Sequence, residues 1–306
     1  MFDPVNPCVG DTFGRGGNTD KVPAARLPLT RLHGFLGQLL RFTWIELQCC
    51  SFAIVVFAGL AVTSVLWKAF DIPVARYDVL LILVVLAQVL FLAFRLETWR
   101  ELLVICVFHL LGLGLEVFKV AVGSWRYPDP GWATVAGVPL FAGFMYASVG
   151  SYICQAFRRF DLRVTRYHWL PVGVLAVLAY ANFFTHHWWP DVRVWLAFGF
   201  LLTTLRSRVW FTVGVQRYWM PVWLSFLLIG FFLWVAENAG TFLDAWRYPH
   251  QEQGWAMVHT GKLGSWALLV ALSFVLVAAV KAQEGRLYGA GEPRIAPTVT
   301  PDPEPD

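Results

Sequence analysis

Long apolar runs alternate with short polar segments along most of this chain. About 20 apolar residues suffice for an α-helix to cross the hydrocarbon core of a bilayer, which is roughly 30 Å thick. The pattern predicts eight spans, at residues 43–66, 77–95, 102–122, 138–157, 169–186, 192–205, 219–242 and 263–281. The sixth span is short, and the apolar pattern allows it to continue through Arg206 and Arg208 into residues 209–213.

The composition agrees with this pattern. Apolar residues make up 58% of the chain and charged residues 14%, with a mean hydropathy of +0.57. Such values are typical of a polytopic membrane protein and not of a soluble domain. We therefore predict an all-α fold, a transmembrane helix bundle of about eight spans.

The two ends of the chain differ from its centre. Residues 1–28 are polar and rich in Gly and Pro, which predicts a flexible cytoplasmic N-terminus without a recognisable signal peptide. Residues 29–42 have apolar positions at helical spacing, as in an interfacial helix that leads into the first span. We predict a single membrane domain over 29–282, followed by a disordered tail over 283–306, which ends in alternating Pro and acidic residues.

The positive charges predict the orientation in the membrane. Most of the 24 Lys and Arg residues fall in the N-terminal segment, in the loops that follow the second, fourth and sixth spans, and in the C-terminal segment. Because cytoplasmic loops carry an excess of Lys and Arg, both termini are expected in the cytoplasm. Membrane lipids are then the expected partners. The net charge of +4 gives no indication of nucleic acid binding, and the sequence specifies no oligomeric state.

Two segments of the chain are near copies of each other. In each, eight residues separate a glutamate, Glu116 or Glu237, from the tetrapeptide Trp-Arg-Tyr-Pro. The offset between the copies places the third span on the seventh and the fourth on the eighth. This predicts two parallel half-repeats of four spans each, over residues 29–160 and 161–282. A chance match is the alternative, because Trp, Arg and Tyr gather at any membrane interface.

The two glutamates are the candidate catalytic residues. A charged side chain in the middle of a bilayer costs about 2.5–3.5 kcal/mol, so an intramembrane acid is by default a functional hypothesis. Each glutamate precedes its tryptophan by nine residues, which places it roughly 13 Å below the outer aromatic belt. Two neighbouring carboxyl groups can act as general acid and base. His109, two helical turns before Glu116, is either a proton relay or a histidine of the helix core.

Other residues near the motifs are candidates for substrate binding. Lys119 lies one turn after Glu116 and is expected to pair with it and tune its acidity. Arg126 and Arg247 either bind an anionic headgroup or cap helix ends. The remaining candidates are polar and aromatic residues expected at the outer mouth or along the fourth span: Trp125, Tyr127, Tyr146, Asn238, Trp246 and Tyr248.

The sequence predicts neither a metal site nor a cofactor. Six residues expected on the outer side could ligate metal, but their spacing matches no metal motif: His186, His187, Asp191, His250, Glu252 and His259. The five cysteines also lack metal-ligand spacing and indicate no disulfide framework. Phosphate-binding loops, dinucleotide fingerprints and serine nucleophile elbows are missing.

The segments Glu116–Pro128, Gly137–Gln155 and Glu237–Gln251, with Lys262, Ser265 and Trp266, resemble the YoaT-like DUF817 family of bacterial integral membrane proteins, over roughly residues 30–285. That resemblance implies a place in the inner membrane of a bacterium, but no activity or cofactor. A shorter similarity, confined to the motif and Gly137–Leu140, links the chain to membrane carotenoid hydratases and lycopene cyclases. It implies proton transfer to a polyene from Glu116 or Glu237. The paired acids of the cyclases are replaced here by Leu140 and Phe141.

Three functions are compatible with these features. The first is a membrane-embedded enzyme that uses the glutamate pair for proton transfer on a hydrophobic small molecule, a lipid or an isoprenoid. The second is a proton-coupled transporter or channel, since repeats and intramembrane carboxylates also suit transport. The third is a membrane scaffold or sensor without chemistry.

Overall fold

The computed structural model describes residues 28–288. The predicted flexible N-terminus and most of the predicted tail lie outside this range. Of the tail, the residues up to Tyr288 are described, and the Val164 amide donates to the carbonyl of buried Leu287 (2.8 Å). The packed part of the chain therefore extends to the end of the described range.

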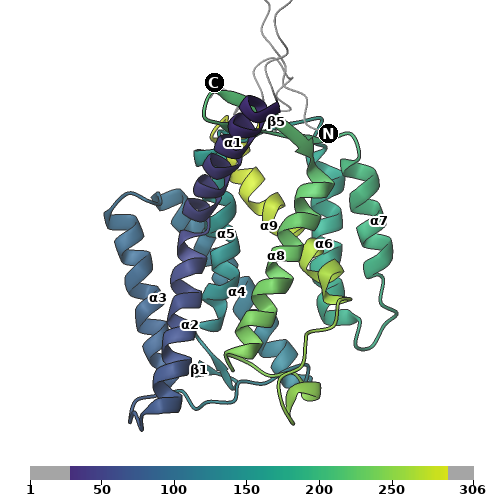
Figure 1. Cartoon of the computed structure of the whole chain (residues 1–306). Helices are drawn as coiled ribbons and strands as arrows, with labels where there is room; N and C mark the ends of the chain where they lie inside the picture. Colours follow the sequence, from purple (N-terminus) through teal and green to yellow (C-terminus); the bar gives the residue numbers. More distant parts are fainter. Residues whose placement is uncertain (1–27, 289–306) are drawn as a thin grey trace, which may run out of the picture.

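The described residues are mostly helical, as predicted (Figure 1). The helices are α1 (Pro28–Cys49), α2 (Ser51–Ala69), α3 (Arg76–Ala93), α4 (Trp99–Ala121), α5 (Ala142–Arg159), α6 (Trp169–Thr185), α7 (Arg193–Thr204), α8 (Val222–Phe242) and α9 (Lys262–Gln283), with a 3₁₀ turn η1 (Pro249–Gln251). Within the described range, five helices are long and apolar enough to cross a membrane: α2, α3, α4, α8 and α9. Helices α6 and α7 are apolar but shorter, and α5 is less apolar.

The predicted all-α fold holds for most of the described residues, but two small sheets depart from it. Strands β3 (Arg163–Thr165), β4 (Arg208–Val213) and β5 (Gln216–Pro221) form an antiparallel sheet in the order β3-β4-β5. Residues 209–213 belong to β4, so they do not continue the sixth span. Their alternation explains this, because Val209, Phe211 and Val213 are buried while the residues between them are not. A second, two-stranded sheet consists of β1 (Thr134–Val135) and β2 (Val138–Pro139).

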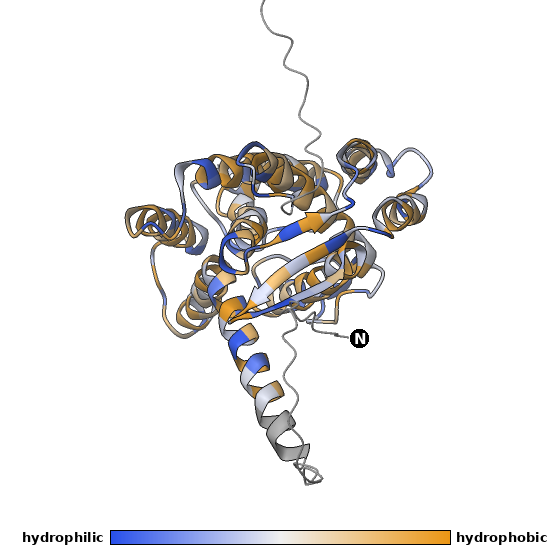
Figure 2. Cartoon of the chain, turned by 90° about the horizontal axis from the view of Figure 1, so that it is seen from above, coloured by the Kyte–Doolittle hydropathy of each residue, from blue (hydrophilic) through white to orange (hydrophobic). Residues whose placement is uncertain are grey.

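The three-stranded sheet covers one end of the helix bundle. In Figure 1 it lies at the upper end, and β1 lies at the opposite end. Figure 2 views the bundle from above, with β4 and β5 crossing its centre and α1 extending away from the body. The predicted first span, 43–66, is divided between α1 and α2 by a turn at Cys50. Helix α1 therefore contains both the predicted interfacial helix, residues 29–42, and the start of the predicted first span.

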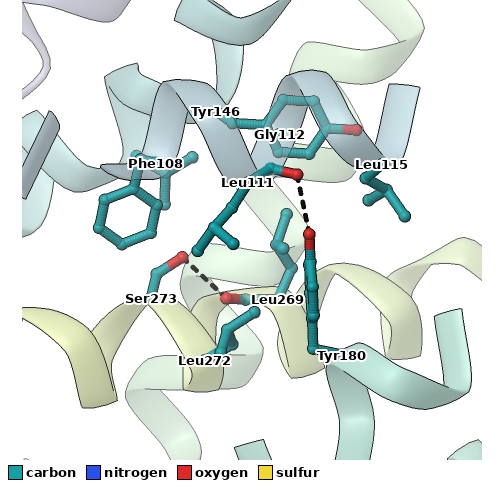
Figure 3. A pocket seen from close by; sticks show the side chains of 10 residues that line it. Phe108, Leu111, Gly112, Leu115, Tyr146, Tyr180, Leu269, Leu272 and Ser273 are labelled. Atoms are coloured by element: carbon teal, nitrogen blue, oxygen red, sulfur yellow. Dashed lines mark hydrogen bonds between the residues drawn. The ribbon is translucent and has the colours of Figure 1, made fainter. Parts of the chain in front are cut away.

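The most extensive helix contacts join α4 to α5 and α8 to α9. Gly112 of α4 permits the first of these, because a β-carbon there would lie 2.4 Å from Cγ of Tyr146 on α5. Figure 3 shows the Tyr146 ring against this glycine, where α4, α6 and α9 meet. On the α6 side, the Tyr180 hydroxyl donates to the Leu111 carbonyl (3.0 Å). Close helix approach at small residues is a usual basis of packing in membranes.

A buried ionic cluster joins α4, α5 and α9 near the sheet. The Glu101 carboxylate accepts from Lys281 (3.3 Å) and from Arg158 (3.2 Å). Lys281 also reaches Glu284 (3.1 Å). The side chains of Glu101 and Lys281 are 2% and 3% exposed, so each charge depends on the other for compensation. This cluster fixes the ends of the three helices relative to one another.

The contact at Gly112 generates a prediction. The variant Gly112→Ala should lower the stability of the protein by about 1–3 kcal/mol, because the added methyl group overpacks against Tyr146. Gly114→Ala is the matched control on the same helix, since nothing lies within 4 Å of a β-carbon there. Thermal unfolding of the purified proteins in detergent measures both. Equal melting temperatures for the two variants would contradict the packing described here.

Candidate functional site

Helices α4 and α8, which carry the two glutamates, end in the same way. Glu116 and Glu237 each lie five residues before the last residue of their helix. The residue after each C-cap is left-handed, Gly123 with φ +72° and Asp244 with φ +56°. In both, the next amide donates to the carbonyl five residues earlier, Ser124 to Lys119 (2.9 Å) and Ala245 to Gly240 (3.0 Å). This is a Schellman end, which reverses the chain direction after the helix.

The reversal brings the two Trp-Arg-Tyr-Pro segments together. The Arg126 amide donates to the Arg247 carbonyl (2.9 Å), and the Arg247 amide donates to the Arg126 carbonyl (2.8 Å). Two exchanged hydrogen bonds are the mark of an antiparallel pair. The ring of Trp125 lies edge-on to the ring of Tyr248, with 5.8 Å between their centroids. The sequence copies therefore form one structural unit at the end of the bundle opposite the three-stranded sheet.

Glu116 is held by three aromatic donors. The Nε1 of Trp125 and the hydroxyls of Tyr127 and Tyr146 each lie 2.7 Å from a carboxylate oxygen. Trp125 and Tyr127 come from the returning segment, and Tyr146 comes from α5. Burial, followed by the charge of Glu116, raises the pKa of the Tyr127 hydroxyl well above its usual value. The hydroxyl therefore stays protonated and able to donate.

Glu237 has a related but different environment. It accepts from the Tyr248 hydroxyl and from Nε1 of Trp266 on α9 (2.6 Å). Tyr248 thus occupies the position that Tyr127 has beside Glu116. Trp246 does not contact Glu237 in this way, because its ring covers Gly240, where a β-carbon would lie 2.3 Å from Cη2. Trp266 provides the indole donor in its place.

Lys262 lies between the two clusters. Its Nζ donates to the Tyr248 hydroxyl (3.1 Å), which donates to Glu237. The same Nζ lies 5.0 Å from the ring centroid of Trp125 and 4.6 Å from that of Tyr248. A cation over two aromatic faces is attracted by both. Lys262, Tyr248 and Glu237 therefore form a hydrogen-bonded chain next to the aromatic donor of Glu116.

Helix α3 fastens both returning segments. Arg76, 3% exposed, donates to the Asp129 carboxylate (3.1 Å) and to the Leu243 carbonyl (2.9 Å) at the end of α8. Tyr77 donates to the Ala245 carbonyl (3.1 Å). A buried arginine is thus compensated by one acid and by helix-end carbonyls. The site depends on α3 although α3 carries none of its acids.

The two motif arginines contact neighbouring acids. Arg126 makes a two-pronged contact with Glu252 (2.5 and 2.6 Å), and its hydrogen bonds hold the pKa of that carboxyl below its usual value. Arg247 contacts Asp244 (3.0 Å). Neither arginine lines the cavity described next. Their expected headgroup contact stays a prediction, and the structure gives them a role in joining the returning segments.

Both carboxylates line one cavity of about 920 Å³. Glu116 and Glu237 are buried, with 3% and 4% of their surfaces exposed. The cavity reaches from Lys119 and Arg193, near these acids, to residues of the three-stranded sheet itself, Phe211 of β4 and Met220 of β5. Its wall is mainly apolar. The exceptions include Glu46 of α1, which accepts from the Tyr152 hydroxyl (3.2 Å).

Three predicted site residues have other surroundings. Lys119 does not pair with Glu116, because its Nζ turns to the imidazoles of His187 (2.9 Å) and His186 (3.4 Å). His109 lies outside the cavity lining, with its ring 4.4 Å from that of Phe144. Asn238 accepts from the Val258 amide (2.9 Å) and fixes a loop. Among the described residues no group of three or more His, Cys, Asp or Glu is arranged to hold a metal.

Sequence reasoning missed Lys262, Trp266, Arg193 and Glu46 as site residues. Lys262 and Trp266 are four residues apart in the first turns of α9, which places them on one helix face. That spacing was the available signal for Lys262 and Trp266. Nothing local in the sequence indicates that α1 or α7 reaches the cavity, because these contacts arise only from the tertiary arrangement.

Long apolar helices around a cavity with buried, hydrogen-bonded acids are typical of an integral membrane protein. The chain belongs to the family described as "Protein of unknown function (DUF817)", whose model matches residues 38–274. It is 47% identical over 245 residues to "Uncharacterized protein YoaT" of Bacillus subtilis (strain 168), covering 80% of this chain and 92% of that protein. No solved structure is significantly similar to it.

The indole bond to Glu237 can be tested by Trp266→Phe, which keeps an aromatic ring but removes the N–H donor. We expect a loss of about 1–3 kcal/mol in unfolding free energy, because a buried carboxylate loses one of its two donors. Trp132→Phe is the control, since Trp132 is 85% exposed. Denaturation followed by circular dichroism measures both changes. A variant as stable as the wild type would show that this hydrogen bond contributes nothing.

Proposed function

We propose that this protein is a membrane-embedded enzyme that transfers protons to and from an elongated hydrophobic substrate, a lipid or an isoprenoid. The observation that carries the proposal is the single large cavity shared by Glu116 and Glu237. Ligand sites are usually concave and mainly apolar, with a few polar groups that fix the orientation of the ligand. This cavity has that character, and Glu116 and Glu237 both lie near one end of it.

In the proposed reaction, one glutamate gives a proton to the substrate and the other takes one from it. The total charge of the site is then the same before and after turnover. The tyrosine hydroxyls on each carboxylate, Tyr146 on Glu116 and Tyr248 on Glu237, donate hydrogen bonds that hold each carboxyl group in position for this exchange. The rings of Trp125, Trp246 and Trp266 also line the cavity, where they could stabilise a developing positive charge.

The proposal retains the predicted topology. It has eight spans in two parallel half-repeats, 29–160 and 161–282, with both termini in the cytoplasm. The matching ends of α4 and α8 support a common origin of the halves, as do the extensive α4–α5 and α8–α9 contacts. The paired motifs then lie at the outer side of the membrane and the three-stranded sheet at the cytoplasmic side. In this proposal the membrane domain spans residues 29–282.

A second candidate is proton-coupled transport. The length of the cavity favours it, since the lining runs from Arg193 and Lys119 to residues of the three-stranded sheet. Transport predicts proton flux into proteoliposomes that contain a pH-sensitive dye, and loss of that flux in Glu116→Gln. The hypothesis of an enzyme instead predicts no proton flux and a chemically changed lipid.

The hypothesis of an enzyme is tested by deleting the gene in its bacterial host and analysing the lipids and pigments of the deletion strain. Wild type should restore the altered compound, whereas Glu116→Gln and Glu237→Gln should each lower its formation at least about 100-fold, as expected for loss of a general acid or base. Asp71→Asn is the control, because Asp71 is exposed and lies outside the cavity lining. Membrane abundance of each variant is measured by immunoblot. Full restoration by both glutamine variants would refute the proposed chemistry.

A further inference from the structure

Basic side chains gather at the end of the cavity near the two glutamates. Lys119 of α4, Lys262 of α9 and Arg193 of α7 all line it, together with His186 and Ser265. Arg193 donates to Ser265 (2.7 Å) and contacts Asp191 (2.5 Å). The cluster therefore combines residues from three helices and from the segment that follows α6.

Lys119 is buried without a carboxylate partner among the described residues. It is 7% exposed, and it forms no ion pair within residues 28–288. Its neighbours at hydrogen-bond distance are the imidazoles of His187 and His186. Burial, and then the charge of Lys119, lower the pKa of His187, which favours the neutral form of this ring. A buried ammonium group with only neutral partners is costly unless an anion joins it.

The other two cations sit at unfavourable positions for a positive charge. Lys262 is the first residue of α9, and Arg193 is the first residue of α7. A helix N-terminus carries a partial positive charge, which disfavours a cation and favours an anion. Asp191 compensates the charge of Arg193. Lys262 forms no ion pair within residues 28–288, because the oxygens of Glu116 and Glu237 accept from neutral tyrosine and tryptophan donors.

We propose that Lys119, Lys262 and Arg193 form a binding site for the anionic headgroup, a phosphate or a carboxylate, of an amphiphile whose apolar chain fills the rest of the cavity. The inference rests on the proposed function for the lipid nature of the ligand, and it narrows the substrate class. The headgroup lies beside Lys119, Ser265 and His186, and the chain extends toward Met220 and Phe211 at the sheet. The reacting part of such a ligand is the part next to its headgroup, where both glutamates lie.

Binding of a matched series of ligands tests the site. Hexadecyl phosphate, hexadecanoic acid, hexadecanol and inorganic phosphate are titrated into the purified full-length protein in detergent, followed by isothermal calorimetry. The wild type should bind at least one of the two anionic chains about tenfold or more tightly than hexadecanol. Lys119→Gln should lose this preference and keep its affinity for hexadecanol. That retained affinity also shows that the variant is folded.

Lys68→Gln is the matched control, because Lys68 pairs with Asp244 outside the cavity lining. It should keep the preference for the anionic chain. Equal binding of anionic and neutral chains by the wild type overturns the proposal. Inorganic phosphate that displaces hexadecyl phosphate at equal concentration also overturns it, by assigning the site to a free anion. If the preference holds while Glu116→Gln and Glu237→Gln stay fully active, the headgroup site stands and the proton-transfer proposal fails.

Discussion

A carboxylate buried among apolar helices must receive hydrogen bonds, and this requirement organises the end of the bundle that carries the motifs. Helix α4 alone offers Glu116 no such partner. The chain provides them by turning back after the helix, so that Trp125 and Tyr127 reach the acid from the returning segment. The same holds for Glu237 and Tyr248. The Schellman ends of the two helices are therefore as necessary to the site as the glutamates themselves.

The cavity follows from this arrangement. Because the two returning segments pair through Arg126 and Arg247, they bring α4 and α8 into one unit and leave a space between the helices behind them. Lys262 occupies the position where the two acid clusters meet, in contact with an aromatic ring from each motif. The two glutamates thus share no hydrogen-bond donor, but the positive charge of Lys262 interacts with both. Such an arrangement suits a site that moves protons without changing its total charge.

The sequence predicted the helical class, the two glutamates and their motifs, because these features depend on local patterns and on the rarity of buried acids. It placed Trp125 at the outer mouth, but gave no indication that the indole N–H of this residue donates to Glu116. It also paired Lys119 with Glu116, since residues one turn apart share a helix face. The actual partners, His186 and His187, come from the distant segment after α6 and give no local signal. The strand over 209–213 was missed because its apolar residues follow a short apolar helix.

The pairing of the two motif segments is the central claim, and a disulfide tests it most directly. In a chain whose five cysteines are replaced by alanine, Arg126→Cys and Arg247→Cys are introduced together and oxidised gently in the membrane. Paired residues in an antiparallel ladder have Cα atoms about 5.5 Å apart, within the usual range for a disulfide. The account predicts rapid and nearly complete cross-linking, seen as a shift on a non-reducing gel, and much slower cross-linking of cysteines at positions 132 and 247. Equal rates for both pairs, or no bond between 126 and 247, would contradict it.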